Sequence, residues 1–326
     1  MTTSGILIEQ TLSILIIIIT GFICYKTKLI DDATNSKLSN ILLTLVQPVL
    51  IFTSFQMEFR RELLEGLLIS LALAFVTHIV AIAITYILIR KKKRKVIVVD
   101  GHPSVTYVEN EDVEVERLTS SYSNMGFMGI PLIYGIFGNE GVLYGTAAVV
   151  AFNLFIWTHG VIMISGVKNL KLKDVLIRLR SPAIIAIFLG LVVFALQIQL
   201  PSVLDKSLNY IGSINTPFAM LIAGVTIGKT DIIKIFTRNL RKYYMVFLRL
   251  LLIPFILMLM YVWLPIDETV KMVAIIMAAT PTAAISTILT IKYKKNSVLA
   301  AEIFALTTVL CVITIPFIVR IAELIM

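Results

Sequence analysis

Charged residues are scarce in this sequence, and their scarcity excludes most classes of soluble protein. Asp, Glu, Lys and Arg make up 15% of the 326 residues, whereas hydrophobic residues make up 58% and the mean hydropathy is +0.93. Ordinary soluble domains are about 45–50% apolar and about 25% charged. The charges fall mainly between long apolar runs, which leaves no room for a separate soluble domain. This pattern is typical of an all-α polytopic membrane protein.

Cysteine and catalytic motifs are also scarce. The two cysteines, Cys24 and Cys311, both lie in apolar runs, so no disulfide framework is indicated. The apolar runs contain no Gly-x-Ser-x-Gly, no His-Glu-x-x-His and no acidic pair, so we expect no enzyme, no metal site and no cofactor. The first apolar run has no basic segment before it, and we expect it to be retained as a helix.

Ten apolar runs approach the length of a membrane-spanning helix. At 1.5 Å per residue, most of them can cross a hydrocarbon core about 30 Å thick. They cover residues 6–25, 41–57, 67–89, 118–137, 142–166, 183–200, 208–228, 243–264, 272–291 and 298–319. Ten spans place both termini on the same side of the membrane.

The basic residues indicate which side that is. One set of alternate loops, including the continuous basic run at 90–95, holds 23 Lys and Arg residues, while the opposite set and the termini hold four. The positive-inside rule therefore places both termini outside the cytoplasm. The compact length and short loops look prokaryotic, so we expect the plasma (cell inner) membrane. The net charge of +9 is explained by this topology, and no nucleic-acid partner is needed.

The helix-breaking residues indicate an internal duplication. At an offset of 156 residues, Asn124 falls on Thr280, and the Gly/Pro-rich break of the fourth span meets TPTAAIS in the ninth. At an offset of 169, Pro48 in the second span meets Pro217 in the seventh. Because each half holds five spans, the second half starts from the opposite side. We therefore predict two inverted five-helix repeats.

The expected organisation follows from these repeats. Residues 1–90 carry spans one to three of the first repeat, and residues 118–166 carry spans four and five. Residues 182–326 form the second repeat, with spans six to ten, after a cytoplasmic linker at 167–181. Residues 91–117 form a long cytoplasmic loop, in which the β-branched residues of VIVVDGHPSVTYV favour a small hairpin. A purely solvated loop and a regulatory or partner-binding loop are both open.

The segment SNMGFMGIPLIYGIFG at 123–138 places helix breakers inside a membrane span. An interrupted helix leaves backbone groups unpaired, which costs several kcal/mol per group in lipid. Secondary transporters place such breaks at matching positions of inverted repeats, where half-helix N-termini face an anionic substrate. We therefore predict that broken spans four and nine cross near the midplane, about 10–13 Å deep. A proline kink with glycine packing is the alternative.

The candidate substrate-binding residues lie at the two breaks or in spans beside them. They are Asn124, Gly126, Gly129, Pro131, Thr280, Pro281, Thr282, Ser286, Asn153 and Arg249. The intramembrane guanidinium of Arg249 can clamp a carboxylate, or it can reach the cytoplasmic edge or pair with Glu302. Asn153 can line the cavity or bond across helices. The scaffold breaks are expected at Gln47, Pro48 and Pro217.

Two further ionisable residues are candidates for ion coupling. His78, at the middle of span three, is either a proton-linked switch or a packing histidine bonded to a neighbour. Glu302 in span ten is either a coupling group or a member of an interfacial ion pair. Coupling to protons and coupling to sodium are both open.

Four segments, SNMGFMGIPL, QPVL, AGVTIG and ATPTAAIS, resemble those of the auxin efflux carrier family, and the resemblance covers essentially the whole chain. That family includes malate and malonate permeases and the plant PIN auxin exporters. The resemblance implies a scaffold domain of spans 1, 2, 6 and 7, and a transport domain whose spans 4 and 9 cross. It also implies elevator-like movement and a homodimer. The loop at 91–117 is longer than we expect for a bacterial member.

We expect a secondary transporter of small organic anions, carboxylates such as malate, malonate or auxin-like acids, that works by alternating access in the lipid bilayer. A sodium-coupled symporter of the bile-acid transporter type is the alternative, with oxygen ligands from Thr280, Thr282 and Ser286. No acidic residue lies at the ninth-span break, which disfavours a dedicated sodium site. A passive channel is disfavoured by the lack of charged rings and repeated filter elements.

Overall fold

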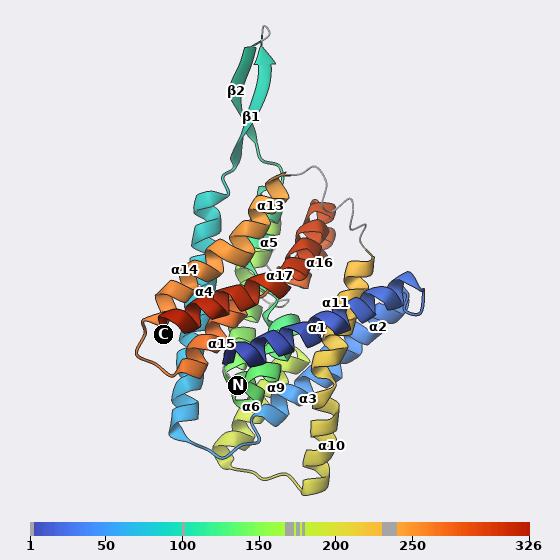
Figure 1. Cartoon of the computed structure of the whole chain (residues 1–326), viewed down its shortest axis with the longest axis vertical. Helices are drawn as coiled ribbons and strands as arrows, with labels where there is room; N and C mark the ends of the chain where they lie inside the picture. The colour runs from blue at the N-terminus through green and yellow to red at the C-terminus, as the bar shows by residue number, and fades with distance from the viewer. Residues whose placement is uncertain (1–2, 100–101, 167–172, 174–176, 178–179, 230–239) are drawn as a thin grey trace.

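The computed structural model describes residues 3–99, 102–166, 173, 177, 180–229 and 240–326. Helices make up most of these residues, and one two-stranded hairpin stands clear of them (Figure 1). Two shorter apolar helices cover Leu12–Lys26 and Pro182–Leu196. The helices long and apolar enough to cross a membrane are Asp32–Ser54, Arg61–Leu88, Met125–Ser165, Ser202–Gly228, Arg241–Val262 and Ser297–Ile325. The prediction of a multi-pass helical membrane protein is confirmed.

The first part of the chain forms three long helical segments. Helix α1 spans Thr3–Lys26 and α4 spans Arg61–Leu88. Between them, α2 (Asp32–Ile41), the π-helical turn η1 (Leu42–Val46) and α3 (Gln47–Ser54) continue one another. The Asp31 side chain accepts a 2.8 Å hydrogen bond from the Thr34 N–H, which caps α2. The second span therefore begins nine residues before the apolar run that marked it.

The middle of the chain holds the hairpin and an interrupted helix. Strands β1 (Lys92–Val99) and β2 (His102–Glu109) precede α5 (Val113–Ser121), which begins inside the loop expected at 91–117. The chain then continues through η2, α6, η3 and α7. These cover Met125–Gly129, Ile130–Phe155, Ile156–Gly160 and Val161–Ser165.

Helix α6 folds back on itself at Gly138. This residue has φ 59° and ψ −146°, a conformation that L-residues rarely adopt. A Cβ atom placed on Gly145 would lie 3.2 Å from the Ile130 Cδ1 atom. Fifteen residues of straight helix would separate these positions by about 22 Å. The 41-residue segment Met125–Ser165 is therefore a helical hairpin with two arms.

We expect Gly138→Ala to lower the free energy of unfolding by about 1–3 kcal/mol. Nothing lies within 4 Å of a Cβ at this position, so the cost comes from the backbone conformation alone. Thermal unfolding of the purified variant in detergent measures this loss. The neighbouring Asn139→Ala is the control, and equal melting temperatures for the two variants would contradict the prediction.

The last part of the chain, from residue 182 onward, again consists of short and long helices. Its elements are α9 (Pro182–Leu196), α10 (Ser202–Ser213), α11 (Asn215–Gly228), α13 (Leu240–Phe247), η5 (Leu248–Leu252), α14 (Ile253–Val262), α15 (Glu268–Ala279), α16 (Ala284–Lys292) and α17 (Ser297–Ile325). Most of the linker expected at 167–181 lies outside the described residues. Both α5 and α15 stop inside the helical body, and each is followed by a short non-helical segment.

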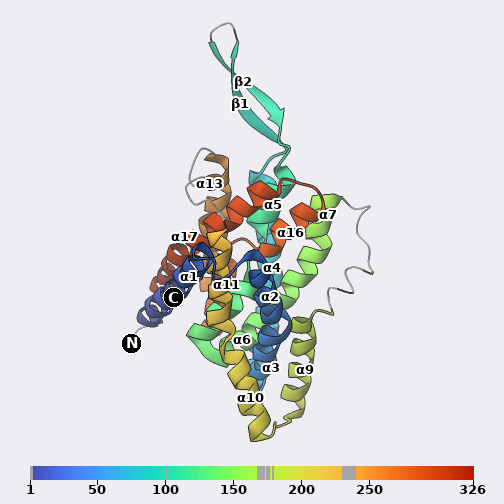
Figure 2. The ribbon, with the colours of Figure 1, turned by 90° about the vertical axis from the view of Figure 1, so that its right-hand side faces the viewer.

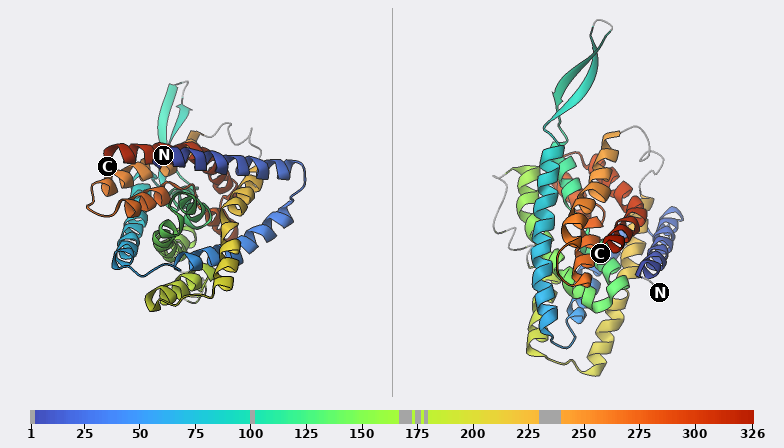
Figure 3. Two further views of the ribbon diagram at one scale, coloured as in Figure 1. Left: turned by 60° about the horizontal axis from the view of Figure 1, so that its bottom comes forward. Right: turned by 60° about the vertical axis from the view of Figure 1, so that its left-hand side comes forward.

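The helices pack mainly in two groups. In one group α1 packs against α11, and α3 packs against α9 and α10. In the other, α6 packs against α4 and α15, while α14 and α17 cover α15. The views in Figures 2 and 3 show the hairpin projecting from one end of this body, with the α9–α10 turn at the opposite end. The site described below lies where the two groups meet.

Four π-helical turns occur in the described residues, and each lies beside a buried or partly buried polar side chain. Turn η1 precedes Gln47, η2 follows Asn124, η3 contains His159, and η5 contains Arg249. A π turn widens the helix and leaves one backbone group without its usual partner, and such turns are frequent at functional sites. No pattern in the sequence indicates these turns.

Candidate functional site

The two helix breaks lie against each other. Ser123 and Thr282 form an isolated antiparallel bridge. The Asn124 N–H donates to the Pro281 carbonyl at 2.8 Å, and the Ala283 N–H donates to the Tyr122 carbonyl at 2.9 Å. Each break therefore supplies backbone partners that the other lost when its helix stopped. We call residues 122–124 and 280–283 the crossing.

Side chains from nearby helix segments reinforce the crossing. The Thr282 hydroxyl donates to the Thr119 carbonyl at 2.8 Å, at the end of α5. The Thr282 N–H donates to the Thr307 hydroxyl of α17 at 3.2 Å. The Thr280 hydroxyl returns to its own helix and donates to the Met277 carbonyl at 2.9 Å. All these threonines are buried, so the crossing is a fixed hydrogen-bonded unit.

Arg249 caps the C-terminal ends of α5 and α15, the two half-helices that stop at the crossing. Its Nη1 donates to the carbonyls of Ser120 and Ser121 in α5, each at 3.2 Å, and its Nη2 donates to the Ala278 carbonyl in α15. A cation is favoured at the negative end of a helix dipole. The guanidinium is fully buried, and its Nε has no hydrogen-bond partner. Arg249 therefore binds main-chain oxygens, and it does not pair with Glu302.

The half-helices that follow the two breaks begin with η2 and with α16, and their N-terminal ends have no such cap. Turn η2 starts after Asn124 and α16 starts after Ala283, and neither residue makes a side-chain capping bond. The first N–H groups of any helix lack partners within the helix, and they carry partial positive charge. The buried Asn124 Nδ2 and Ser286 Oγ beside these ends also have no hydrogen-bond partner.

Two residues of the group formed by α1, α3, α9, α10 and α11 bond to the broken helix. The Gln47 Nε2 of α3 donates to the Gly126 carbonyl at 2.6 Å. The Thr216 hydroxyl of α11 donates to the Pro131 carbonyl at 3.1 Å. Beside Thr216, the buried Asn215 has an Nδ2 without a partner. Both groups of helices therefore contribute polar contacts to one interrupted segment.

The glycines and prolines of the broken segments have distinct places. A Cβ on Gly129 would lie 2.5 Å from the Met277 sulfur, so this glycine lets η2 approach α15. Gly126 lies against Gln47: a Cβ added to this glycine would lie 3.5 Å from the Gln47 Nε2 atom. Pro131 and Pro48 closely follow the π-helical turns η2 and η1, inside helical segments that continue into α6 and α3. Their missing N–H groups therefore leave a carbonyl of the preceding turn without its usual partner. Pro217 lies in the first turn of α11.

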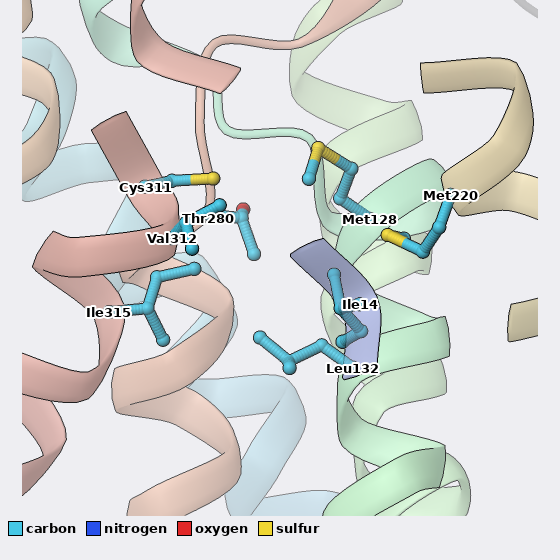
Figure 4. A pocket seen from close by; sticks show the side chains of 8 residues that line it. All are labelled: Ile14, Met128, Leu132, Met220, Thr280, Cys311, Val312 and Ile315. Carbon is cyan, nitrogen blue, oxygen red and sulfur yellow. The ribbon is translucent and has the colours of Figure 1, made fainter. Parts of the chain in front are cut away.

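A small apolar cavity lies at the crossing, between the two groups of helices. Figure 4 shows Thr280 with the α17 side chains on one side, opposite the side chains from α1, η2, α6 and α11. The cavity has a volume of about 30 Å³, which holds roughly two water molecules. Its lining consists of Ile14, Met128, Leu132, Met220, Thr280, Cys311, Val312 and Ile315.

Three candidate residues lie outside the crossing. The Asn153 Nδ2 donates to the Val149 carbonyl of its own helix at 2.8 Å. The His78 Nδ1 bonds the Ala74 carbonyl at 2.7 Å, and its ring stacks on that of Phe155, with the ring centres 5.0 Å apart. Its buried Nε2 has no hydrogen-bond partner. Glu302 pairs with the buried Lys242 at 3.2 Å, as expected for a helix-end ion pair.

Sequence reasoning missed several residues of the site. The apolar cavity lining gave no signal, because Leu, Ile and Met are common in every span. Tyr122, whose carbonyl accepts from Ala283, carries no distinctive pattern either. Asn215 and Thr216 could have been found, because two polar residues directly before Pro217 stand out inside an apolar span.

Comparison with known proteins agrees with this architecture. A family model described as a membrane transport protein matches residues 6–319. An uncharacterized transporter of Methanothermobacter thermautotrophicus is 21% identical over 313 residues, which cover 94% of this chain and 96% of the relative. The match extends through both breaks, Gln47, Thr216 and Arg249. The chain therefore belongs to the membrane transport protein family, that of the auxin efflux carriers.

Proposed function

We propose that this membrane transporter moves small organic anions, with carboxylates as the substrate class, and that the anion binds at the crossing. One observation carries the proposal: the C-terminal ends of the half-helices are capped by Arg249, while the N-terminal ends have no side-chain cap. The protein thus neutralises the negative helix ends and leaves the positive ends for a ligand. An anion fits such a site, and a cation does not.

The unpartnered side-chain groups support the same sign of charge. The amide nitrogens of Asn124 and Asn215 are hydrogen-bond donors without acceptors, and Arg249 Nε is a third. An ionised carboxylate offers only acceptor atoms, so it complements donors of this kind. The cavity lining is otherwise apolar, so it suits an anion with a hydrocarbon portion.

The proposal includes alternating access between two helix groups. The cavity holds roughly two water molecules, which is too small for a dicarboxylate, so the groups must separate at this point for the substrate to enter. The group with α1, α3, α9 and α11 would form the scaffold. The group that carries the crossing would move as a rigid body relative to the scaffold, which is elevator-type transport.

The paired breaks support two inverted repeats of five helices. In the first half α5 stops before the break and η2 follows it, and in the second half α15 stops before the break and α16 follows it. The Ser123–Thr282 bridge places the two breaks side by side. Matching interrupted helices that meet in this way are what two inverted repeats produce. With both termini outside, the basic loops would face the cytoplasm of a cell membrane.

A sodium-coupled symporter remains the second candidate, and the hydrogen bonds at the crossing disfavour it. Sodium needs several oxygen atoms, and broken helices provide them as free carbonyls. Here the carbonyls of Ser121, Ala278 and Gly126 already accept bonds from Arg249 and Gln47. The buried guanidinium adds positive charge to the same place. Transport that persists without sodium would exclude this candidate.

We expect Asn124→Ala to reduce carboxylate exchange by about 10- to 100-fold, because one bond to a charged group contributes about 1.5–3 kcal/mol. Its amide nitrogen has no protein partner, so folding should be unaffected. The measurement is counterflow of labelled malate, malonate and indole-3-acetate in proteoliposomes, with and without sodium. Asn40→Ala, at an exposed position, is the control. Undiminished exchange by Asn124→Ala would refute the site.

A further inference from the structure

The base of the β-hairpin lies between the C-terminal end of α4 and the start of α5, the helix that leads into the crossing. Helix α4 ends at Leu88, and the six basic residues at 90–95 follow at once; we call them the basic collar. The last turn of α4 exposes Tyr86, Ile87 and Leu88, which are 43%, 66% and 38% accessible. Exposed apolar residues beside a tyrosine are typical of a helix end at the membrane interface. The collar therefore begins where the headgroups lie.

The collar is held in a fixed place. Arg117 of α5 donates from Nε and Nη2 to the Ile89 carbonyl at 3.0 and 2.7 Å, and its guanidinium lies 4.1 Å from the centre of the Tyr86 ring. The Asn110 N–H donates to the Lys91 carbonyl at 2.7 Å, which closes the base of the hairpin. The strand register is continuous from the Lys92–Glu109 pair onward.

Two acidic residues of the loop, Glu114 and Glu116, pair with basic residues outside the collar. Glu116 is buried and binds Arg241 of α13 through both oxygens, and it accepts a bond from Asn110 at 2.7 Å. Glu114 pairs with Lys295 at 3.4 Å, before α17. Glu109 lies opposite Lys92 in the register and offsets at most one charge of the collar.

The collar therefore keeps a large positive excess. The described side chains of Arg90, Lys91 and Lys92 are exposed, and none of them forms an ion pair. Strong positive charge at a helix end complements anionic phospholipid headgroups, which attract basic residues near the membrane surface. We propose that the basic collar is a binding surface for anionic phospholipid headgroups of the cytoplasmic leaflet.

The position of the collar gives this contact a consequence. Only Asn110, Glu111 and Asp112 separate the hairpin from α5, and α5 leads directly into the crossing. The collar is therefore joined through this short segment and the Asn110–Lys91 bond to the start of α5, the helix that ends at the crossing. This inference depends on the loop alone, and it stands whether or not carboxylates are the substrate.

The test compares lipid retention by two variants with equal loss of charge. In the collar variant Lys91, Lys92, Lys93, Arg94 and Lys95 are replaced by Gln, and in the control Lys168, Lys171, Lys173, Arg178 and Arg180 are replaced by Gln. Native mass spectrometry of the purified proteins measures competition between phosphatidylglycerol and phosphatidylcholine of the same chain length. Gel filtration and thermal unfolding in phosphatidylcholine check folding.

We expect the wild type and the control to prefer phosphatidylglycerol, and the collar variant to lose at least about tenfold of that preference. The preference of the wild type should fall as salt rises, because salt screens exposed charges. An unchanged preference in the collar variant, or an equal loss in both variants, would overturn the proposal. If the collar variant did not fold, a wild-type preference insensitive to salt would overturn it as well.

Discussion

Replacing Arg249 with methionine is expected to lower the free energy of unfolding by about 3–5 kcal/mol, the usual cost of removing one partner from a buried charged contact. Three carbonyls, those of Ser120, Ser121 and Ala278, would lose their donor inside the protein. The half-helix ends would keep their negative charge next to the proposed anion site. We therefore expect carboxylate exchange to be lost even at temperatures where the variant is folded.

The geometry of the guanidinium permits a sharper comparison. Arg249 uses two different nitrogens for the two half-helices, whereas a lysine presents all its donors at one atom. Arg249→Lys should therefore recover less than half of the lost stability although it keeps the charge. Arg61→Met, which removes an exposed pair with Glu65, is the control and should change little.

Thermal unfolding in detergent and counterflow in proteoliposomes test both statements. If Arg249→Met melted with wild type and exchanged substrate normally, the carbonyl ends would need no cap, and the electrostatic argument for an anion site would fail. If Arg249→Lys matched wild type, charge would suffice, and the two-sided contact would be unimportant.

The positions of the breaks were predictable from the sequence because their signal is local. Asn124, Gly126, Gly129 and Pro131 are poor helix formers within eight residues of one another, and such residues cost energy in any helix. The hairpin was predictable for the same reason, since VIVV and TYV are rich in β-branched and aromatic residues around a turn. Both features depend on neighbouring residues.

The partners of the buried polar groups were not predictable. The Arg249 bonds join residues that lie 129 and 29 positions apart, and their acceptors are main-chain oxygens, which every residue has. For Arg249 the sequence offered a carboxylate clamp, the cytoplasmic edge or a pair with Glu302, and none of these is the capping contact. His78 and Glu302 show the same limit, because a buried ionisable group has several possible partners and the sequence names none of them.

The helix boundaries were missed where polar residues are buried. The residues Val113–Arg117 look like a solvated loop, yet α5 starts at Val113 because Glu116 is satisfied by Arg241 and Asn110. A hydropathy scale measures the free energy of transferring each residue from water to lipid. It does not show whether a charged residue is paired inside the protein.

The second large effect is expected at Gly224, where α11 crosses α1. A Cβ on Gly224 would overlap the Ile18 carbonyl oxygen, and a Cβ on Gly21 would overlap the Leu221 carbonyl oxygen. These obstacles are backbone atoms, so the helices must move apart to admit even one methyl group. This explains the AGVTIG segment in physical terms: its first glycine permits the close approach of two helices.

We expect Gly224→Ala to cost at least about 2–3 kcal/mol, the upper part of the usual overpacking range. Gly212→Ala in α10 is the matched control, because its Cβ would meet the Leu50 Cα atom at 3.3 Å, which needs a shift of only a few tenths of an ångström, and alanine favours the helix. Ile14 of α1 and Met220 of α11 line the cavity at the crossing. Gly224→Ala should therefore impair exchange as well as stability, while Gly212→Ala should have a much smaller effect on both. Equal melting temperatures for the two variants would show that α1 and α11 can separate freely, and that this side of the cavity is not rigid.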